Sequence, residues 1–226
     1  MRKKIVIRPL IREKFQEFLQ GQRILFFSAP CGFGKTTVAE ALLSGRAVLR
    51  RSGEDEDPIP KEGDWNILLV DDFQRMPEEN VLALCQYIRS TPDRRFVFLS
   101  RGVPPGCMMA FQYAGIMGVI SAREMLFDEE DIQTLFRLYD VPVTRSEVSG
   151  ILKESIGYAL GVAITVRLMA SGRPFGPELV KDAFQEVYRY FEAAIFMPLD
   201  LTIRRFLLEL APFETVNLEM AKMVSG

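Results

Sequence analysis

The chain of 226 residues contains no histidine. The Ser-His-Asp and Cys-His forms of nucleophilic catalysis therefore cannot be built within it, and neither can a metal site with histidine ligands. Its three cysteines, Cys31, Cys85 and Cys107, are widely spaced and form no Cys-x-x-Cys pair. This spacing is typical of reduced thiols in a cytoplasmic protein, not of a disulfide framework or a zinc site.

Long apolar runs and a strong charge of one sign are also missing. No stretch approaches the length of a membrane span, and the apolar segment after the basic start is too short for a signal peptide. The net charge is −2, so the chain lacks the basic field typical of a nucleic-acid binder. With 48% hydrophobic residues, the composition predicts a globular, cytoplasmic protein without a membrane partner.

A glycine-rich stretch at residues 28–37 gives the first positive indication of function. It reads Ser-Ala-Pro-Cys-Gly-Phe-Gly-Lys-Thr-Thr, follows the apolar run 24–27 and precedes a helical pattern at 38–43. A strand, a glycine-rich turn and Gly-Lys-Thr at a helix start are the context of a phosphate-binding P-loop. Lys35 would reach the β- and γ-phosphates, and Thr36 would bind Mg²⁺. We expect the nucleotide contacts at Pro30, Cys31, Gly32, Phe33, Gly34, Lys35, Thr36 and Thr37.

One position departs from the strict P-loop pattern. Ala29 stands where the pattern has glycine, and alanine fits there if its backbone φ is negative. A surface loop rich in small residues is the alternative interpretation. The strand before the loop and the helix after it favour the nucleotide site.

The run Asn66–Gln74 is the second chemical landmark. Its apolar part predicts a strand buried on both faces, as in a parallel sheet, with Asp71 and Asp72 at its carboxyl end. Such sheets place ligands at this end. Asp71 would hold Mg²⁺ directly or through water, and Asp72 would orient or activate the attacking water. Taken alone, the Asp-Asp pair would also fit a helix cap or a turn.

A second buried strand, at 95–101, ends in Ser100-Arg101. An arginine at this edge of the sheet suits a sensor of the γ-phosphate, although a surface arginine that caps a loop is the alternative. Lys35, Asp72 and Arg101 are therefore the candidate catalytic residues. The acidic stretch 52–64 could bind Mg²⁺, but its composition is more typical of a solvated loop.

The remaining patterns divide the chain. We expect short strands near 47–50 and 119–120 and a helix over 78–88, whereas only helical patterns follow residue 123. Asp128 and Asp131 predict a capping box. The expected helices lie near 144–154, 159–170, 178–194, 200–211 and 217–225. These patterns predict an α/β P-loop domain over 1–122, a helical domain over 123–172 and a further helical segment over 173–226.

Five segments together resemble one family, the MalT-like LuxR-type transcription regulators, which belong to the STAND class of signalling NTPases. Residues 28–37 resemble the family's SAPAGYGKTT loop, and Leu68–Gln74 resembles LVLDDYH. Phe98–Pro105 resembles LASR-x-x-PP, Met125–Asp131 resembles L-x-F-t-x-x-E, and Glu154–Ala163 resembles EGWPAGL. The five segments follow the family's order across nearly the whole chain.

The resemblance implies a P-loop NTPase domain, a helical lid, and the start of a winged-helix domain near Phe191. It implies a switch that binds ATP or ADP with Mg²⁺, in which slow hydrolysis, as a weak ATPase, gates self-association and transcription activation. In the family a repeat-rich sensor and a DNA-binding helix-turn-helix follow, so DNA contact is expected only through a C-terminal part absent from this chain. The chain would then be a fragment or a short relative.

Three features depart from the family pattern. Ala159 replaces a proline that touches the adenine in related proteins, and Tyr158 replaces the motif's tryptophan. The connection between Lys35 and Asp71 is short, which predicts a loop crossover and a reduced sheet.

Two other functions fit the same motifs. One is a P-loop kinase for a small molecule, with Asp72 as the base for the acceptor hydroxyl, although no arginine-rich lid is evident. The other is an interaction scaffold that holds ADP without turnover.

Overall fold

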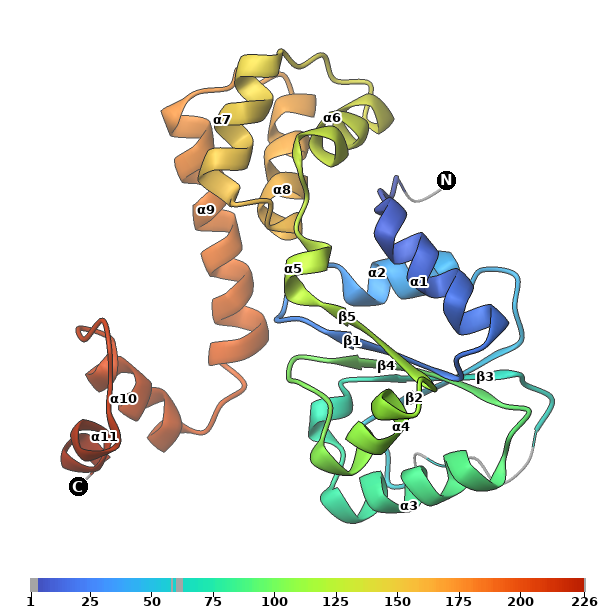
Figure 1. The fold of residues 1–226 in the computed structure, drawn as a ribbon. Coiled ribbons are helices and arrows are strands. Elements are labelled where there is room, and N and C mark those ends of the chain that lie inside the picture. Colours follow the sequence, from blue (N-terminus) through green and yellow to red (C-terminus); the bar gives the residue numbers. More distant parts are fainter. Residues whose placement is uncertain (1–3, 58, 60–62, 226) are drawn as a thin grey trace. The chain divides into compact units, whose positions relative to one another are not determined.

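A computed structural model of the chain describes residues 4–57, 59 and 63–225, as Figure 1 shows. The chain divides into two compact units, Met1–Arg173 and Pro174–Gly226. The predicted boundary near residue 123 falls inside the first unit, and the finer division there stays a prediction. Pro58 and Pro60 of the predicted acidic loop lie outside the described residues.

A parallel sheet of five strands forms the centre of the first unit, in the order β2-β3-β4-β1-β5. Its register pairs Ser28, the last residue of β1, with Ser100 on one side and Ser121 on the other. The carboxyl ends of β1, β4 and β5 therefore lie at one edge. The predicted α/β P-loop fold class is confirmed. The strands are β1 (Ile24–Ser28), β2 (Val48–Ser52), β3 (Ile67–Asp71), β4 (Arg95–Ser100) and β5 (Met117–Ser121).

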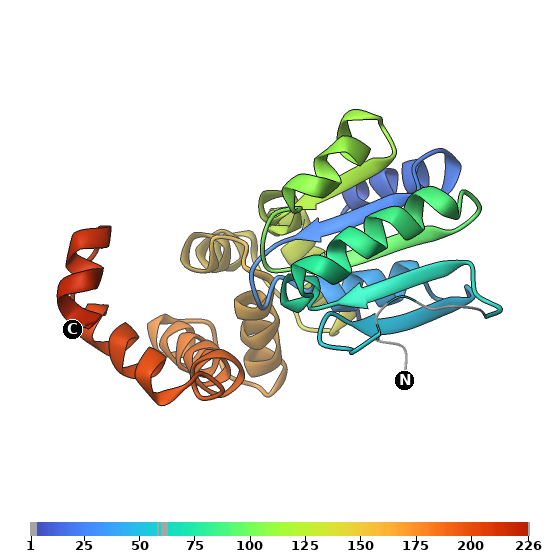
Figure 2. The same cartoon turned by 90° about the horizontal axis from the view of Figure 1, so that it is seen from below.

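Helices cover both faces of this sheet (Figures 1 and 2). Side chains alternate between the faces along a strand, so β1 contributes to two apolar cores. Leu25 and Phe27 pack with α1 and α2, whereas Ile24 and Phe26 pack with α3 and α4. These helices are α1 (Pro9–Gln20), α2 (Lys35–Leu42), α3 (Glu78–Ser90) and α4 (Met109–Tyr113).

The connection from β2 to β3 is the loop crossover that the sequence predicts. Its described residues between 53 and 66 contain no helix, and β2 pairs directly with β3. The five strands expected from the sequence are present, and a reduction of the sheet relative to the resembled family stays a prediction. The predicted end of the buried strand at the carboxylate pair is confirmed: β3 ends at Asp71, and a 3₁₀ turn, η1 (Phe73–Arg75), follows.

Helices complete the first unit after β5. The predicted capping box at the start of α6 is confirmed: Asp128 accepts from the Asp131 backbone N–H, and the Asp131 side chain accepts from the Asp128 N–H. Thr144 and Glu147 form a second capping box at the start of α7. Helices α6, α7 and α8 pack against one another. This segment comprises α5 (Ala122–Met125), α6 (Glu129–Leu138), α7 (Arg145–Ser155) and α8 (Ala159–Ala170).

Charged side chains join the N-terminal region to this helical segment. Arg8 donates from Nε to Asp131 Oδ2 at 2.8 Å and from Nη2 to Asp128 Oδ2 at 2.7 Å. Lys14 on α1 pairs with Glu124 on α5. Burial raises the pKa of Glu124, but hydrogen bonds from Lys14 and Ser121 outweigh it, so the net pKa is lowered. The carboxylate is thus held in its charged form.

In its described residues, the second unit consists of helices joined by turns and contains no strand. It contains α9 (Pro177–Phe191), a π-helical turn at Glu192–Phe196, α10 (Leu201–Leu210) and α11 (Leu218–Ser225). The helices predicted there are confirmed, and their assignment to a winged-helix domain stays a prediction. Among the described residues, no helix is long and apolar enough to cross a membrane.

Candidate functional site

The glycine-rich stretch forms the turn between β1 and α2 that the sequence predicts. Gly32 and Gly34 adopt φ of +79° and +83°, backbone angles that L side chains rarely take. Gly34 is the residue before the first turn of α2, so free N–H groups of the turn face the loop. Ala29 is not among the described residues with positive φ, and it is 1% exposed. The alanine therefore fits the loop as expected.

Lys35 lies folded back on its own loop. Its Nζ donates to the carbonyl oxygens of Ala29 at 2.6 Å and Pro30 at 3.0 Å. Burial lowers the pKa of the Lys35 ammonium, with nearby Arg101 adding to the effect and the thiol of Cys31 and the carboxylates opposing it. A partly buried cation that donates to neutral carbonyl oxygens is suited to exchange them for an anionic ligand.

Thr36 and Asp71 come into direct contact. The Thr36 Oγ1 donates to Asp71 Oδ2 at 2.9 Å, and Asp71 Oδ1 accepts from the Asp72 backbone N–H at 2.8 Å. Within the described part of the chain there is no cluster of three or more His, Cys, Asp or Glu side chains suited to a metal. A hydroxyl with one carboxylate fits Mg²⁺, which typically takes one or two protein carboxylates and completes its shell with water and phosphate oxygens.

Asp72 and Arg101 lie beside this pair, joined by a residue that sequence reasoning missed. Asp72 leaves the strand with φ +47° at the start of η1, so it occupies a turn as well as the sheet edge. Its Oδ1 lies 3.5 Å from Arg101 Nη2. Gln74 bridges the two: its Nε2 donates to Asp72 Oδ1 at 2.7 Å, and its Oε1 accepts from the Arg101 N–H at 2.9 Å. The only sequence signal for Gln74 was its place two residues after the carboxylate pair.

The start of α8 contacts the P-loop. Tyr158 Oη donates to the carbonyl oxygen of Cys31 at 3.0 Å, and the Leu160 N–H donates to the carbonyl oxygen of Gly32 at 3.1 Å. The rings of Tyr158 and Phe33 meet edge to face, with centroids 5.3 Å apart. A Cβ on Gly32 would lie 1.7 Å from Tyr158 Oη. A side chain at position 32 would therefore displace Tyr158 as well as strain the backbone.

The remaining predicted contact residues follow the loop. Pro30 and Thr37 are exposed, and Cys31 and Phe33 are half-buried. Ala159, where the family has proline, is the first residue of α8. The structure thus brings the candidate metal-binding and catalytic residues to one edge of the sheet: Lys35, Thr36, Asp71, Asp72 and Arg101.

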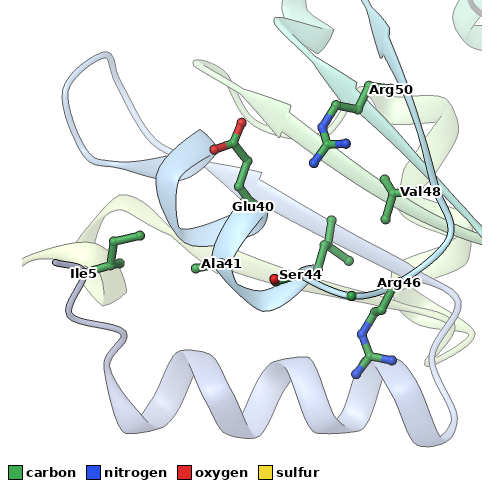
Figure 3. A pocket seen from close by; sticks show the side chains of 9 residues that line it. Ile5, Glu40, Ala41, Ser44, Arg46, Val48 and Arg50 are labelled. Atoms are coloured by element: carbon green, nitrogen blue, oxygen red, sulfur yellow. The ribbon is translucent and has the colours of Figure 1, made fainter. Parts of the chain in front are cut away.

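A separate hollow of about 660 Å³ lies between the C-terminal end of α2 and the start of β2 (Figure 3). None of the predicted nucleotide contacts lines it. Arg46, on its rim, lies over the ring of Phe15 of α1, 5.5 Å from the centroid. The lining residues are Ile5, Glu40, Ala41, Leu43, Ser44, Gly45, Arg46, Val48 and Arg50.

The fold and the arrangement of this edge define the class of protein: a P-loop NTPase fold. Its solved neighbours include ATPases. The Walker-type ATPase PABY2304 of Pyrococcus abyssi aligns with a TM-score of 0.62 at 12% identity, over 99% of this chain and 89% of that one. The RuvB Holliday junction branch migration motor of Thermotoga maritima aligns with a TM-score of 0.55 at 14% identity, over 96% and 81%.

A third neighbour is a STAND ATPase with a tetratricopeptide repeat sensor, PH0952 of Pyrococcus horikoshii. It aligns with a TM-score of 0.55 at 16% identity, and this chain spans 36% of its length. No protein-family model and no curated protein matches the chain. At these identities the similarity establishes the fold alone.

Proposed function

We propose that this chain is the nucleotide-binding switch region of a STAND-type NTPase. The observation that carries the proposal is the 2.9 Å contact between Thr36 of the P-loop and Asp71 at the end of β3. It unites the two motifs that hold a magnesium nucleotide in P-loop proteins at the edge where such sheets bind ligands. The fold shared with a STAND ATPase supports the same assignment.

Each residue of the site has a distinct role in this account. A bound Mg²⁺ would supply neutralisation of phosphate charge. Thr36 and Asp71 hold the metal, and Lys35 leaves the carbonyl oxygens of Ala29 and Pro30 to bind phosphate. Asp72 orients the attacking water, and Arg101 pairs with the γ-phosphate.

Gln74 fixes the spacing between Asp72 and Arg101. It holds the carboxylate of Asp72 and the backbone of Arg101 at the same time. A single side chain therefore links the water-orienting group to the γ-phosphate sensor. Slow hydrolysis would reset the switch, not supply a product.

Transmission to the rest of the protein begins at Tyr158. The contacts of Tyr158 and Leu160 with the loop join α8, and through it α6 and α7, to the phosphate site. A nucleotide that alters the loop would change these contacts and bias the helices.

The finer identity that we propose is a MalT-like LuxR-type regulator. The order of the five motifs in the sequence supports it. In the intact protein the switch would gate self-association and transcription activation, and DNA would be bound by a C-terminal helix-turn-helix outside this chain.

Nucleotide titration tests the proposal. Calorimetry with ATP and ADP in the presence of Mg²⁺ should give binding by the unaltered chain, and Lys35→Ala should weaken ATP binding at least about 10-fold, because a charged hydrogen bond is lost. Lys153→Ala is the matched control, since Lys153 is exposed on α7. Equal affinities in all three proteins, or no binding to the unaltered chain, would overturn the proposal.

A further inference from the structure

Two of the three cysteines lie side by side beneath the sheet. Cys85 on α3 and Cys107 on the 3₁₀ turn η2 (Gly106–Met108) have their Sγ atoms 4.0 Å apart. Both are free thiols and belong to the apolar core on the α3 face of the sheet. A disulfide has an S–S distance of about 2.0 Å, so the two sulfur atoms must approach by about 2 Å for the bond to form.

We propose that Cys85 and Cys107 are a redox pair that closes to an intramolecular disulfide on reaction with a small-molecule disulfide. The inference is independent of the proposed nucleotide function, since it follows from the placement of the two sulfur atoms. It concerns a covalent modification that does not involve the P-loop cysteine, Cys31.

The order of the two steps follows from exposure. Cys107 is partly exposed, whereas Cys85 is 4% exposed. Burial raises the pKa of the Cys85 thiol to about 12, and the neighbouring Cys107 adds to the effect. The thiolate is the reacting form, so Cys107 meets the oxidant first and Cys85 acts as the second thiol.

The chemistry balances with one disulfide oxidant. The Cys107 thiolate attacks a sulfur of oxidised glutathione, an S–S bond breaks, and one glutathione thiolate leaves. The Cys85 sulfur, after losing its proton to solvent, attacks Cys107 Sγ in the mixed disulfide and expels the second glutathione thiolate. The two protein thiols lose two electrons in total, and one oxidised glutathione becomes two reduced molecules.

The position of the bond gives it a consequence. η2 follows β4 and Arg101 through the short segment Gly102–Pro105, and α3 follows β3 and the Asp71-Asp72 pair. A Cys85–Cys107 bond would close a loop that contains all of β4. It would join the segment after Arg101 to the helix after the carboxylates, and so restrict movement of these two segments relative to each other.

Mass spectrometry of the full chain tests the pair directly. The protein is incubated with oxidised glutathione, unfolded, alkylated and digested. We expect a linked peptide of Cys85 and Cys107 whose mass is two hydrogen atoms below the sum of the two free peptides, and full recovery of both thiols after reduction with dithiothreitol. Cys31 remains available for alkylation or carries glutathione alone.

Two single variants separate a true pair from independent reactions. Cys85→Ser should trap a stable glutathione adduct on Cys107, because no second thiol expels it. Cys107→Ser should leave Cys85 unmodified, since it is buried in the folded chain. A persistent adduct on Cys107 in the unaltered protein with Cys85 still free, or a bond from either cysteine to Cys31 or to a second chain, would overturn the proposal.

Discussion

The hydroxyl of Tyr158 donates a hydrogen bond to the carbonyl oxygen of Cys31 at 3.0 Å, across 127 positions of sequence. It joins the N-terminal end of α8 to the turn that we propose as the phosphate site. A hydrogen bond at this point makes the conformation of the loop and the position of α8 dependent on each other. Three of the predictions below follow from this connection.

Removing the hydroxyl should weaken the connection without removing the ring contact. Tyr158→Phe keeps the edge-to-face packing on Phe33 but loses the bond to Cys31, so we expect the free energy of unfolding to fall by about 0.5–1.5 kcal/mol. Urea unfolding of the variant and the unaltered chain measures this difference in the free energy of unfolding. Tyr113→Phe is the control, since Tyr113 is 84% exposed. Equal changes in the two variants would show that the Tyr158 bond adds nothing.

The two loop glycines should differ when replaced by alanine. Both have φ near +80°, so each substitution costs about 1–2 kcal/mol for the left-handed backbone. A Cβ on Gly34 meets no atom within 4 Å, whereas one on Gly32 would lie 1.7 Å from Tyr158 Oη. We therefore expect Gly32→Ala to lower stability more than Gly34→Ala.

A double variant isolates the steric part of this difference. Adding Tyr158→Ala to Gly32→Ala removes the clash, so the two changes together should cost less than the sum of their separate effects. The effects of Tyr158→Ala and Gly34→Ala on the free energy of unfolding should simply add. Additivity in both pairs would contradict the close approach of Tyr158 to Gly32.

Ile156 carries backbone strain beside the same connection. It ends α7 in the left-handed region, with φ +52°, although it is β-branched and 73% exposed. Ile156→Gly should therefore raise the free energy of unfolding by about 1 kcal/mol, since little packing is lost. Val103→Gly is the control, because Val103 is also exposed but has no positive φ. Glycine adds freedom to the unfolded chain there without relieving strain, so the free energy of unfolding of this variant should fall. A loss of stability in Ile156→Gly would refute the strain.

The ion pair of Glu124 should make stability depend on pH. The folded state lowers the pKa of Glu124, because hydrogen bonds from Lys14 and Ser121 outweigh burial. Its contribution is therefore present above the pKa of the unfolded chain and is lost as the pH falls through the lower folded pKa. Glu124→Gln should be less stable than the unaltered chain at neutral pH and approach it in acid.

Unfolding curves at several pH values measure this difference. Glu130→Gln is the control, because Glu130 is exposed in the first turn of α6. A difference for Glu124→Gln that stays constant as the pH falls would count against a charged contact with Lys14.

The sequence predicts the central strands β1, β3 and β4 well because they are short, mainly apolar and buried on both faces. The run at 67–70 and the strand that begins at Arg95 are examples, with every residue of the first buried. The capping box at Asp128 was predictable because it depends on neighbours three residues apart. β5 is longer than predicted, since Gly118 interrupts its apolar pattern.

The site was predictable in its parts but not in its connections. Lys35, Thr36 and Asp71 follow from local motifs. The bridge by Gln74 and the contact of Tyr158 with the loop join segments far apart in the chain, and no local pattern encodes the distance between them. The folded-back position of Lys35 likewise depends on which loop carbonyl oxygens lie within reach.

The magnesium dependence of ATP affinity tests the central claim most directly. Thr36→Val removes the hydroxyl that contacts Asp71 and keeps the shape of the side chain. Calorimetry with and without Mg²⁺ should show that the metal strengthens ATP binding to the unaltered chain and that this gain is lost in Thr36→Val, while metal-free binding is retained. If Mg²⁺ strengthens ATP binding equally in both proteins, or if the unaltered chain binds no ATP in either condition, Thr36 and Asp71 do not hold a magnesium nucleotide.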